Sequence, residues 1–475
     1  MSEKDKKNIR VIKVDIKKKD ELYNVCLKYS ILAKNLYNFT NYKIRQVYLI
    51  SKRIKEKKEI KEEMLKRYNE VLDEINKFNE ETKTNKVLFQ NKWYGDYIGG
   101  NGIKSSLNSM LKDKYDFIQM PSRTSSDIIG QVATMWKSYF KAMESYAKDK
   151  SKFSGLPKPP TYKKDKSVFV IDSESVIIKD NKLSFKKGKK GYRSYNEFNC
   201  KHNIKVPLPN WERNKYSDAN LCYIRVVPKN NKFTLEFVYS IDVKPKNEIN
   251  GRTIAIDIGV DRLATVCNNI NEKPFAINGK PLKSANKYYN KISSKYKSEL
   301  MKTNGRYTSN KYKKMCDKRN SIMDTYMHQS ASYIIKWCEK YNIDTIVIGK
   351  NKNWKQKINI GNETQTFMQI PFAKFIDKIV YRAETLGINV VLQEESYTSK
   401  SSFIDSDAIP KYGVDDNDNK FSGRRVQRGL YKSKDGTKIH ADLNGAYNIL
   451  RKYDKTFTYN NNELHPYIVI PNKSL

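Results

Sequence analysis

Residues 254–260 form an almost wholly apolar run, IAIDIGV, that contains a single carboxylate, Asp257. Such a run is typical of a strand buried on both faces, and an isolated charge in that setting is costly to bury. Asp257 must therefore be hydrogen-bonded, protonated or bound to a metal ion. A lone buried aspartate is more often a hydrogen-bonded structural group, so the choice depends on which other acids the fold brings near it.

Three other acids stand at the ends of predicted elements in the same half of the chain. Glu394 and Glu395 end a predicted strand, and Asp442 begins a short predicted helix, where a simple N-cap is its alternative role. If these acids converge on Asp257, they form an all-oxygen site for hard divalent cations such as Mg²⁺, and two such ions stabilise both reacting oxygens of phosphodiester cleavage. Four histidines and the lack of a GxxxxGK[ST] motif disfavour imidazole-based and P-loop chemistry.

The order of predicted elements around Asp257 is that of an RNase H-like α/β core. Three strands come first, and a long basic helical stretch follows at 283–340, with a break near Asn304-Gly305. A strand, a helix that Pro371 opens at its first position, and a further strand come next. A polar insert then separates this last strand from the final helix.

The N-terminal half predicts a different architecture. Residues 8–16 alternate apolar and polar side chains as a strand does, and helical spacing follows as far as residue 150. A heptad-like stripe from Met64 to Phe78 favours an intramolecular helical hairpin over an intermolecular coiled coil.

The segment 151–166 interrupts the helical pattern with three prolines, which enforce extended backbone, and five lysines, which suggest contact with phosphates. Short strand patterns between residues 168 and 241 then suggest a small β-barrel, which the strand at 8–16 could close.

The charge of the chain predicts a polyanionic partner. Its 475 residues include 91 Lys+Arg against 52 Asp+Glu, a net charge of +39, which points to nucleic acid. Mutational bias in an AT-rich genome is an alternative source of part of this excess. No run of apolar residues is long enough to span a membrane, and the basic N-terminus lacks the apolar core of a signal peptide, so a cytoplasmic, nucleoid-associated protein is expected. Six widely spaced cysteines without a CxxC pair fit free thiols.

Four segments resemble the TnpB family of transposon-encoded, RNA-guided nucleases, which is related to miniature type V CRISPR effectors and to Fanzor proteins. The close match covers about residues 250–453, and KFSGLPKPPTYKK resembles the linker before the barrel of this family. The segments are IAIDIGVDRLATV (254–266), DTIVIGKNKNWKQ (344–356), QIPFAKFIDKIVYRAETLGINVVLQEESYTSKSSF (369–403) and GRRVQRGLYKSKDGTKIHADLNGAYNIL (423–450).

The resemblance implies a RuvC-like nuclease whose Asp–Glu–Asp triad holds two Mg²⁺ ions, for which Mn²⁺ can substitute. Asp257 matches the first aspartate and Asp442 the last. Many members carry the glutamate directly after the strand that here ends at Gly349, whereas a glutamate relocated to just before the YTS segment is similar to Fanzor proteins and one TnpB branch. Strand alternation would place Glu394 and Glu395 on opposite faces, and we favour Glu395, with Glu394 as the alternative.

A second departure from the family concerns zinc. Many TnpB proteins follow the YTS segment with a four-cysteine ribbon, whereas this chain has Ser402 at the first position and no cysteine after Cys338. No structural zinc is expected, and the insert is either held without it or partly mobile until nucleic acid binds. Solvation is the expected role of the aspartates of the insert, with spare metal ligands as the alternative: Asp405, Asp407, Asp415, Asp416 and Asp418.

The resemblance also implies partners. A guide RNA, from a transposon end or a CRISPR array, would pair with double-stranded target DNA, and the barrel and helical lobe would read a short flanking motif. A monomer is expected rather than a homodimer. The alternatives are an RNA-guided DNA-binding repressor without cleavage and an accessory protein of transposition. The candidates for nucleic-acid contact are Lys318, Arg319, Trp354, Arg424, Arg425 and Arg428.

The expected fold class is therefore multidomain α+β, with an N-terminal helical lobe and a small β-barrel ahead of an RNase H-like (RuvC) nuclease domain. The predicted segments are the first barrel strand at 1–18, the helical lobe at 19–150, linker and barrel at 151–248, the nuclease core at 249–398, the insert at 399–438, the last nuclease segment at 439–455 and a C-terminal tail at 456–475.

Overall fold

The computed structural model divides the chain into two compact units, Met1–Asp242 and Val243–Leu475. This division lies close to the boundary predicted at 248–249, and each unit has an apolar core of its own. The residues that the structure describes are 8–20, 22–83, 107–108, 111–179, 182–185, 204–205, 220–241, 250–351, 364–411, 420–458 and 463–471.

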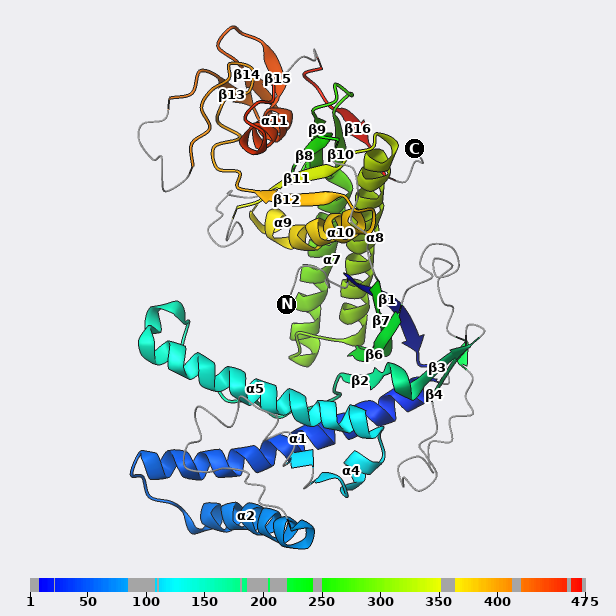
Figure 1. The fold of residues 1–475 in the computed structure, drawn as a ribbon, viewed down its shortest axis with the longest axis vertical. Coiled ribbons are helices and arrows are strands. Elements are labelled where there is room, and N and C mark those ends of the chain that lie inside the picture. The colour runs from blue at the N-terminus through cyan, green and yellow to red at the C-terminus, as the bar shows by residue number, and fades with distance from the viewer. Residues whose placement is uncertain are drawn as a thin grey trace. The chain divides into compact units, whose positions relative to one another are not determined.

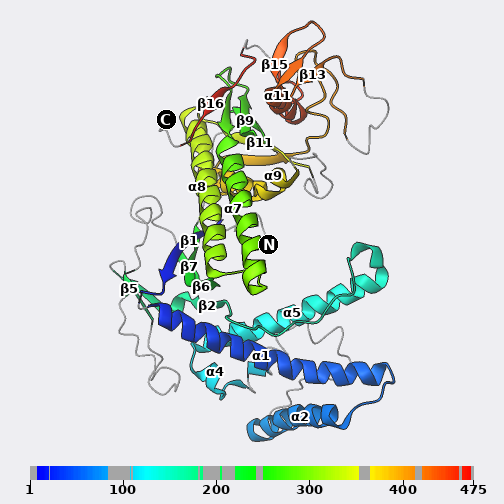
Figure 2. The same cartoon turned by 180° about the vertical axis from the view of Figure 1, so that it is seen from behind.

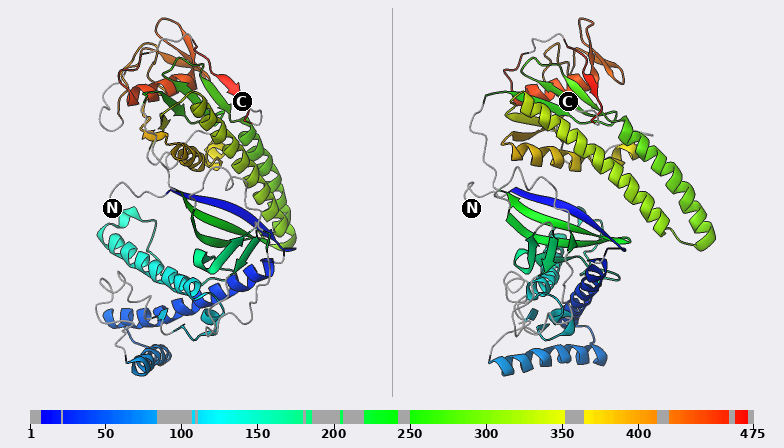
Figure 3. Two further views of the ribbon diagram at one scale, coloured as in Figure 1. Left: turned by 45° about the vertical axis from the view of Figure 1, so that its right-hand side comes forward. Right: turned by 90° about the vertical axis from the view of Figure 1, so that its right-hand side faces the viewer.

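The first unit contains an antiparallel sheet in the order β1-β7-β6-β2. The predicted first strand pairs with the last strand of the unit from Asn8↔Ile241 to Lys17↔Lys232, as Figure 3 shows. The strands are β1 (Asn8–Lys17), β2 (Phe169–Asp172), β6 (Asn220–Lys229) and β7 (Lys232–Ile241). A second sheet joins β3 (Val176–Lys179), β4 (Lys182–Phe185) and β5 (Ile204–Lys205). The pairings among these described strands leave both sheets open, so a closed barrel stays a prediction.

Helices pack on this sheet and on one another. Trp136 of α5 lies 5.1 Å from Tyr48 of α1 between ring centroids, and its Nε1 donates to Oδ1 of Asn41 at 2.9 Å. Lys43 of α1 pairs with Glu74 of α2 at 2.7 Å, so the stripe predicted around Val71 does form an intramolecular helical hairpin (Figure 2). The helices are α1 (Leu22–Lys55), α2 (Glu62–Thr82), α4 (Tyr115–Ile118) and α5 (Ser122–Lys148).

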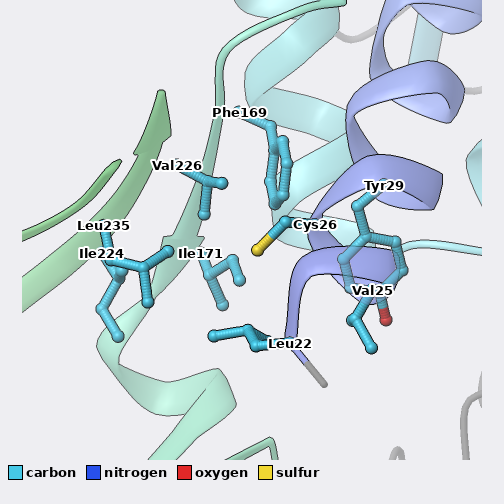
Figure 4. A pocket seen from close by; sticks show the side chains of 9 residues that line it. All are labelled: Leu22, Val25, Cys26, Tyr29, Phe169, Ile171, Ile224, Val226 and Leu235. Carbon is cyan, nitrogen blue, oxygen red and sulfur yellow. The ribbon is translucent and has the colours of Figure 1, made fainter. Parts of the chain in front are cut away.

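The contact between α1 and the sheet is a packed core rather than a binding site. A void in this core measures about 10 Å³ and is lined by apolar side chains, so it has neither the room nor the polar partners that a ligand needs (Figure 4). The lining residues are Leu22, Val25, Cys26, Tyr29, Phe169, Ile171, Ile224, Val226 and Leu235.

The proline-containing linker has neither helix nor strand at residues 156–164, and it lies along α1. The side chain of Asn38 bonds both the N–H and the C=O of Lys163, at 2.8 and 2.9 Å. The ammonium of Lys163 donates to Oγ of Ser167 at 2.6 Å and lies 4.0 Å from the ring centroid of Tyr37. This lysine therefore has a structural role, and the prediction of phosphate contact is weakened for it.

The second unit is built on a mixed sheet in the order β12-β11-β8-β9-β10-β16. β8, β9 and β10 are antiparallel, whereas β11 and β12 run parallel to β8, which is the strand order of an RNase H-like core. The strands are β8 (Thr253–Asp257), β9 (Arg262–Asn268), β10 (Phe275–Asn278), β11 (Thr345–Gly349), β12 (Asn389–Gln393) and β16 (Tyr467–Val469). β16 corrects the prediction of a simple tail at 456–475, because it pairs in parallel with β10.

Helices cover both faces of this sheet (Figure 1). Ile254, Ile256 and Ile348 pack with α8 and α10, whereas Ala255 and Val347, on the opposite face, pack with α11. The predicted helical break is present at Gly305, whose φ is +59°, and Pro371 is the N-cap of α10 rather than its first residue. The helices are α7 (Lys280–Asn304), α8 (Asn310–Lys340), α9 (Thr364–Gln369), α10 (Phe372–Thr385) and α11 (Ala441–Tyr453). No helix in the described ranges is long and apolar enough to cross a membrane.

The described part of the insert is held by apolar packing and hydrogen bonds. Phe403 stacks on Tyr447 of α11 with 4.5 Å between ring centroids. Oδ2 of Asp407 accepts the N–H groups of Ser402 and Ser422, at 2.8 and 3.1 Å. It thereby joins the part of the insert around Ser402 to the part around Ser422. The strands of the insert are β13 (Arg424–Gln427), β14 (Leu430–Lys432) and β15 (Lys438–His440).

These contacts correct the role expected for two aspartates of the insert. Asp407 joins the parts of the insert around Ser402 and Ser422, and Asp405 accepts the N–H of Lys434 at 2.9 Å. Both aspartates therefore have structural roles and are not merely solvated. The other aspartates, Asp415, Asp416 and Asp418, lie outside the described residues.

Candidate active site

Asp257 ends β8 on the face that α11 covers. Because strand side chains alternate, it shares this face with Ala255, which packs on α11. A Cβ at Gly445 of α11 would lie 2.8 Å from Oδ2 of Asp257, so only glycine at position 445 leaves room for this carboxylate. Asp442 precedes Gly445 by one helical turn, which brings it to the same side of α11.

Asp442 is not needed as the cap of its own helix. The N-cap of α11 is His440, whose Nδ1 accepts the N–H of Asp442 at 3.3 Å. The alternative role considered for Asp442 is therefore filled by another residue. Its carboxylate lies 3.4 Å from the guanidinium of Arg425, and at the positive end of a helix dipole.

Glu395 reaches the same end of the sheet from the turn after β12. A Cβ at Gly349 would lie 2.6 Å from Oε2 of Glu395, so this carboxylate lies directly over Gly349. Gly349 follows Ile348, which pairs with Ile256, and it therefore stands beside Asp257 on the neighbouring strand. Neighbouring strands are about 4.8 Å apart, so the two carboxylates come from adjoining strand ends.

The backbone around Glu395 is fixed on both sides. Its N–H donates to Oδ1 of Asn351 at 3.1 Å, and its C=O accepts the hydroxyl of Thr398 at 2.9 Å. Tyr397, two residues later, has a φ of +62°, which turns the chain sharply away from the sheet.

Glu394 points elsewhere and is already paired. Its Oε2 accepts the ammonium of Lys452 at 2.7 Å, and its Oε1 accepts the N–H of Ser396 at 2.7 Å. Of the two glutamates that the sequence left open, Glu395 is therefore the one that lies with Asp257.

The site is electrostatically strained when its acids are charged. Burial raises the pKa of Asp257 well above its ordinary value, and the charges of Glu395 and Asp442 raise it further, while Arg425 acts in the opposite direction. Burial raises the pKa of Glu395 to about 7, which a hydrogen bond from the Asn351 backbone partly opposes. A bound cation relieves this kind of repulsion.

The donor chemistry of the site fits a hard divalent cation, since all three side chains offer carboxylate oxygens. Within the described ranges, however, no three His, Cys, Asp or Glu side chains are already drawn together around one point. The acids thus share one end of the sheet without forming a preassembled cage.

The other predicted contact residues differ in their surroundings. Lys318 and Arg424 are exposed, while Arg428 pairs with Asp261 at 2.9 Å. Arg319 donates to Oδ1 of Asn286 at 2.8 and 2.7 Å and to the C=O of Gln369 at 2.7 Å. It thereby joins α8 to α7 and to the end of α9, a structural role, so it is no longer a favoured candidate. Trp354 lies outside the described residues.

Sequence reasoning missed the residues that make room for the acids or hold them. Gly445 lies within the DLNGAYNI segment, where its motif could have drawn attention to it. His440 and Lys452 carry no signal in the sequence, because their roles depend on partners from distant segments.

Comparison with known proteins adds two family models. One, OrfB_IS605, described as "Probable transposase", matches residues 236–355, which include Asp257 and Gly349. The other, described as "Cas12f1-like, TNB domain", matches residues 372–449, which include Glu395 and Asp442. A search of curated proteins finds no match.

Three solved structures show distant similarity. A Cas12f1–sgRNA–target DNA complex is 16% identical with a TM-score of 0.31, over 94% of this chain and 100% of that one. A CRISPR–Cas12f ternary complex is 17% identical with a TM-score of 0.33, over 82% and 80%. The mini-RNA-guided endonuclease CRISPR-Cas_phi3 is 11% identical with a TM-score of 0.40, over 94% and 92%. The two family models match successive parts of the chain, and they support the TnpB-like family that the sequence motifs resemble.

Proposed function

We propose that the protein is an RNA-guided DNA endonuclease whose active site is formed by Asp257, Glu395 and Asp442. The observation that carries the proposal is the approach of two acids to glycines: Asp257 to Gly445 and Glu395 to Gly349. Three segments far apart in the sequence thereby bring carboxylates to one end of the sheet. The similarity to the two family models supports the same reaction.

In this proposal Asp257, Glu395 and Asp442 hold two Mg²⁺ ions, and Mn²⁺ can replace them. When bound, such cations stabilise the charge that develops on the attacking and leaving oxygens of a phosphodiester. The protein itself contributes buried carboxylates that are costly to ionise without a cation, together with the positive end of α11. Arg425, beside Asp442, is in position to contact a substrate phosphate.

The proposed partners are a guide RNA and double-stranded target DNA. The net charge of +39 supports binding to nucleic-acid backbones, while base pairing with the guide selects the sequence. Exposed cations of the second unit, among them Lys318 and Arg424, are proposed contacts. We propose that a monomer cuts both strands in turn with this one site.

The test uses the full chain purified with its copurifying RNA. The RNA is sequenced to define the guide, and a plasmid library with a matching target reveals the flanking motif. Asp257→Ala and Asp442→Ala are expected to abolish cleavage and to leave RNA binding intact. Normal cleavage by either variant would overturn the assignment. Target binding by the wild type with no EDTA-sensitive cut would instead support the repressor alternative.

A further inference from the structure

Lys452 lies in the last turn of α11 with only 9% of its side chain exposed. Its ammonium donates to Oε2 of Glu394 at 2.7 Å, to the C=O of Ser396 at 2.8 Å and to the C=O of Pro410 at 3.3 Å. An ammonium has three N–H groups, so each of them has an acceptor. A buried cation with complete hydrogen bonding holds its partners in one arrangement.

Two of the acceptors flank Glu395 directly. Glu394 precedes it and Ser396 follows it, and these two neighbours are also joined to each other by the bond from the Ser396 N–H to Oε1 of Glu394. Lys452 therefore fixes the turn on both sides of Glu395, and its charge also acts on the Glu395 carboxylate, whose pKa it lowers.

The same helix holds the rest of this turn. Nδ2 of Asn448 donates to the C=O groups of Thr398 and Ser401 at 2.9 and 2.7 Å, and Nδ2 of Asn444 also reaches Ser401, at 2.8 Å. Residues 444, 448 and 452 are four apart, so they form one stripe along α11. Asp442 stands at the start of the helix that carries this stripe.

We propose that Lys452 is a positioning residue that places Glu395 relative to Asp442 for cation binding. The proposal rests on the proposed function. The ion pair of Lys452 with Glu394, together with the bond from Lys452 to the C=O of Ser396, forms a clamp around Glu395, so Glu394 belongs to this clamp and not to the metal site. α11 then sets the distance between the two acids. Asp442 lies in its first turn, and Lys452, which holds the turn around Glu395, lies in its last.

The test measures cation binding to the full-length protein without DNA. The readout is the rise in melting temperature with Mn²⁺, compared with that of Asp257→Ala, which serves as the background for ions bound elsewhere. Lys452→Met is expected to weaken the apparent Mn²⁺ affinity at least about tenfold, because the turn is released. Lys455→Met, which removes an exposed lysine three residues later, is the matched control and is expected to stay within about twofold. Amide hydrogen exchange is expected to speed up at 394–398 in Lys452→Met alone.

Glu394→Ala removes the same ion pair from its more exposed side, so it tests the clamp even if Lys452→Met does not fold. It is expected to weaken Mn²⁺ binding in the same way. Glu395→Gln separates the two proposals. If Glu395→Gln weakens binding while Lys452→Met and Glu394→Ala do not, the positioning role is overturned and the proposed site stands. If Glu395→Gln changes nothing, Glu395 is not a cation ligand, and both proposals fall.

Discussion

The carboxylate of Glu395 occupies the space in which a side chain at position 349 would have to begin. A Cβ on Gly349 would meet Oε2 of Glu395 at 2.6 Å and Cδ1 of Ile449 at 2.5 Å, closer than real Cβ atoms approach their neighbours. A side chain at the end of β11 would therefore displace the Glu395 carboxylate from the position that it occupies. The absence of a glutamate at position 349 and the presence of one at position 395 are therefore linked, because Gly349 leaves free the space that the Glu395 carboxylate occupies.

We predict that Gly349→Ala lowers cleavage about 10- to 100-fold by displacing Glu395, and costs about 1–3 kcal/mol of stability through overpacking. The rate is measured on a matched target, and stability by denaturant unfolding. Gly155→Ala is the control, because its Cβ would meet nothing within 4 Å. Wild-type cleavage by Gly349→Ala would contradict the close approach.

The two neighbouring glutamates are predicted to respond differently to loss of charge. Glu395→Gln removes a proposed cation ligand and is expected to lower the rate by at least about 100-fold. Glu394→Gln keeps one acceptor for the clamp and is expected to cost less than about tenfold at saturating Mg²⁺. Single-turnover cleavage distinguishes the two, and the reverse order of effects would exchange their roles.

The raised pKa of Glu395 predicts a pH-dependent stability in EDTA. Its pKa is about 7 in the folded protein against an ordinary value of 4.5, so the folded state binds the proton more tightly. The wild type therefore loses stability, relative to Glu395→Gln, as pH rises from 4.5 to above 7. The difference is expected to reach about 3 kcal/mol at pH 8 and to vanish near pH 4. Melting curves at both pH values check it, and a difference independent of pH would be inconsistent with a buried acid.

Asp407 is predicted to hold the insert together. Asp407→Ala removes the acceptor for the N–H groups of Ser402 and Ser422, and we expect a loss of about 1–3 kcal/mol of local stability. Limited proteolysis within 399–438 should become faster. Asp405→Ala is the matched comparison, since Asp405 accepts the backbone N–H of Lys434, and an equal effect would argue against a special role for Asp407.

Two adjacent basic residues of α8, Lys318 and Arg319, are predicted to have different roles. Arg319→Ala breaks the bonds to Asn286 and Gln369 and is expected to cost about 2 kcal/mol of stability. Lys318→Ala is expected to leave the melting temperature unchanged and to reduce the salt dependence of nucleic-acid binding by about one phosphate contact. Thermal melts and binding titrations at several salt concentrations measure both effects.

The sequence predicted the elements that have strong local signals. Strands are present within the stretch from 168 to 241 that had short strand patterns, among them Lys182–Phe185 and Lys232–Ile241, and the helical break falls at Gly305. The apolar run around Asp257 did become a central strand, because a run that is apolar on both faces can be covered only from both sides.

What the sequence could not decide depends on distant partners. β12 ends at Gln393, so strand alternation did not apply to Glu394 and Glu395, and their directions follow from Lys452 and Asn351 instead. Arg319 looked like any exposed basic residue of a helix until Asn286 and Gln369 were brought beside it.

The C-terminal segment has a practical consequence for anyone who attaches another domain to this protein. Tyr467–Val469 completes the edge of the central sheet, and the C=O of Leu464 accepts the N–H of His440, the residue that caps α11. Shortening the chain into this stretch would uncover the edge of β10 for pairing with other molecules and loosen the start of the helix that carries Asp442. A fusion partner should therefore begin beyond Pro471, behind a flexible linker.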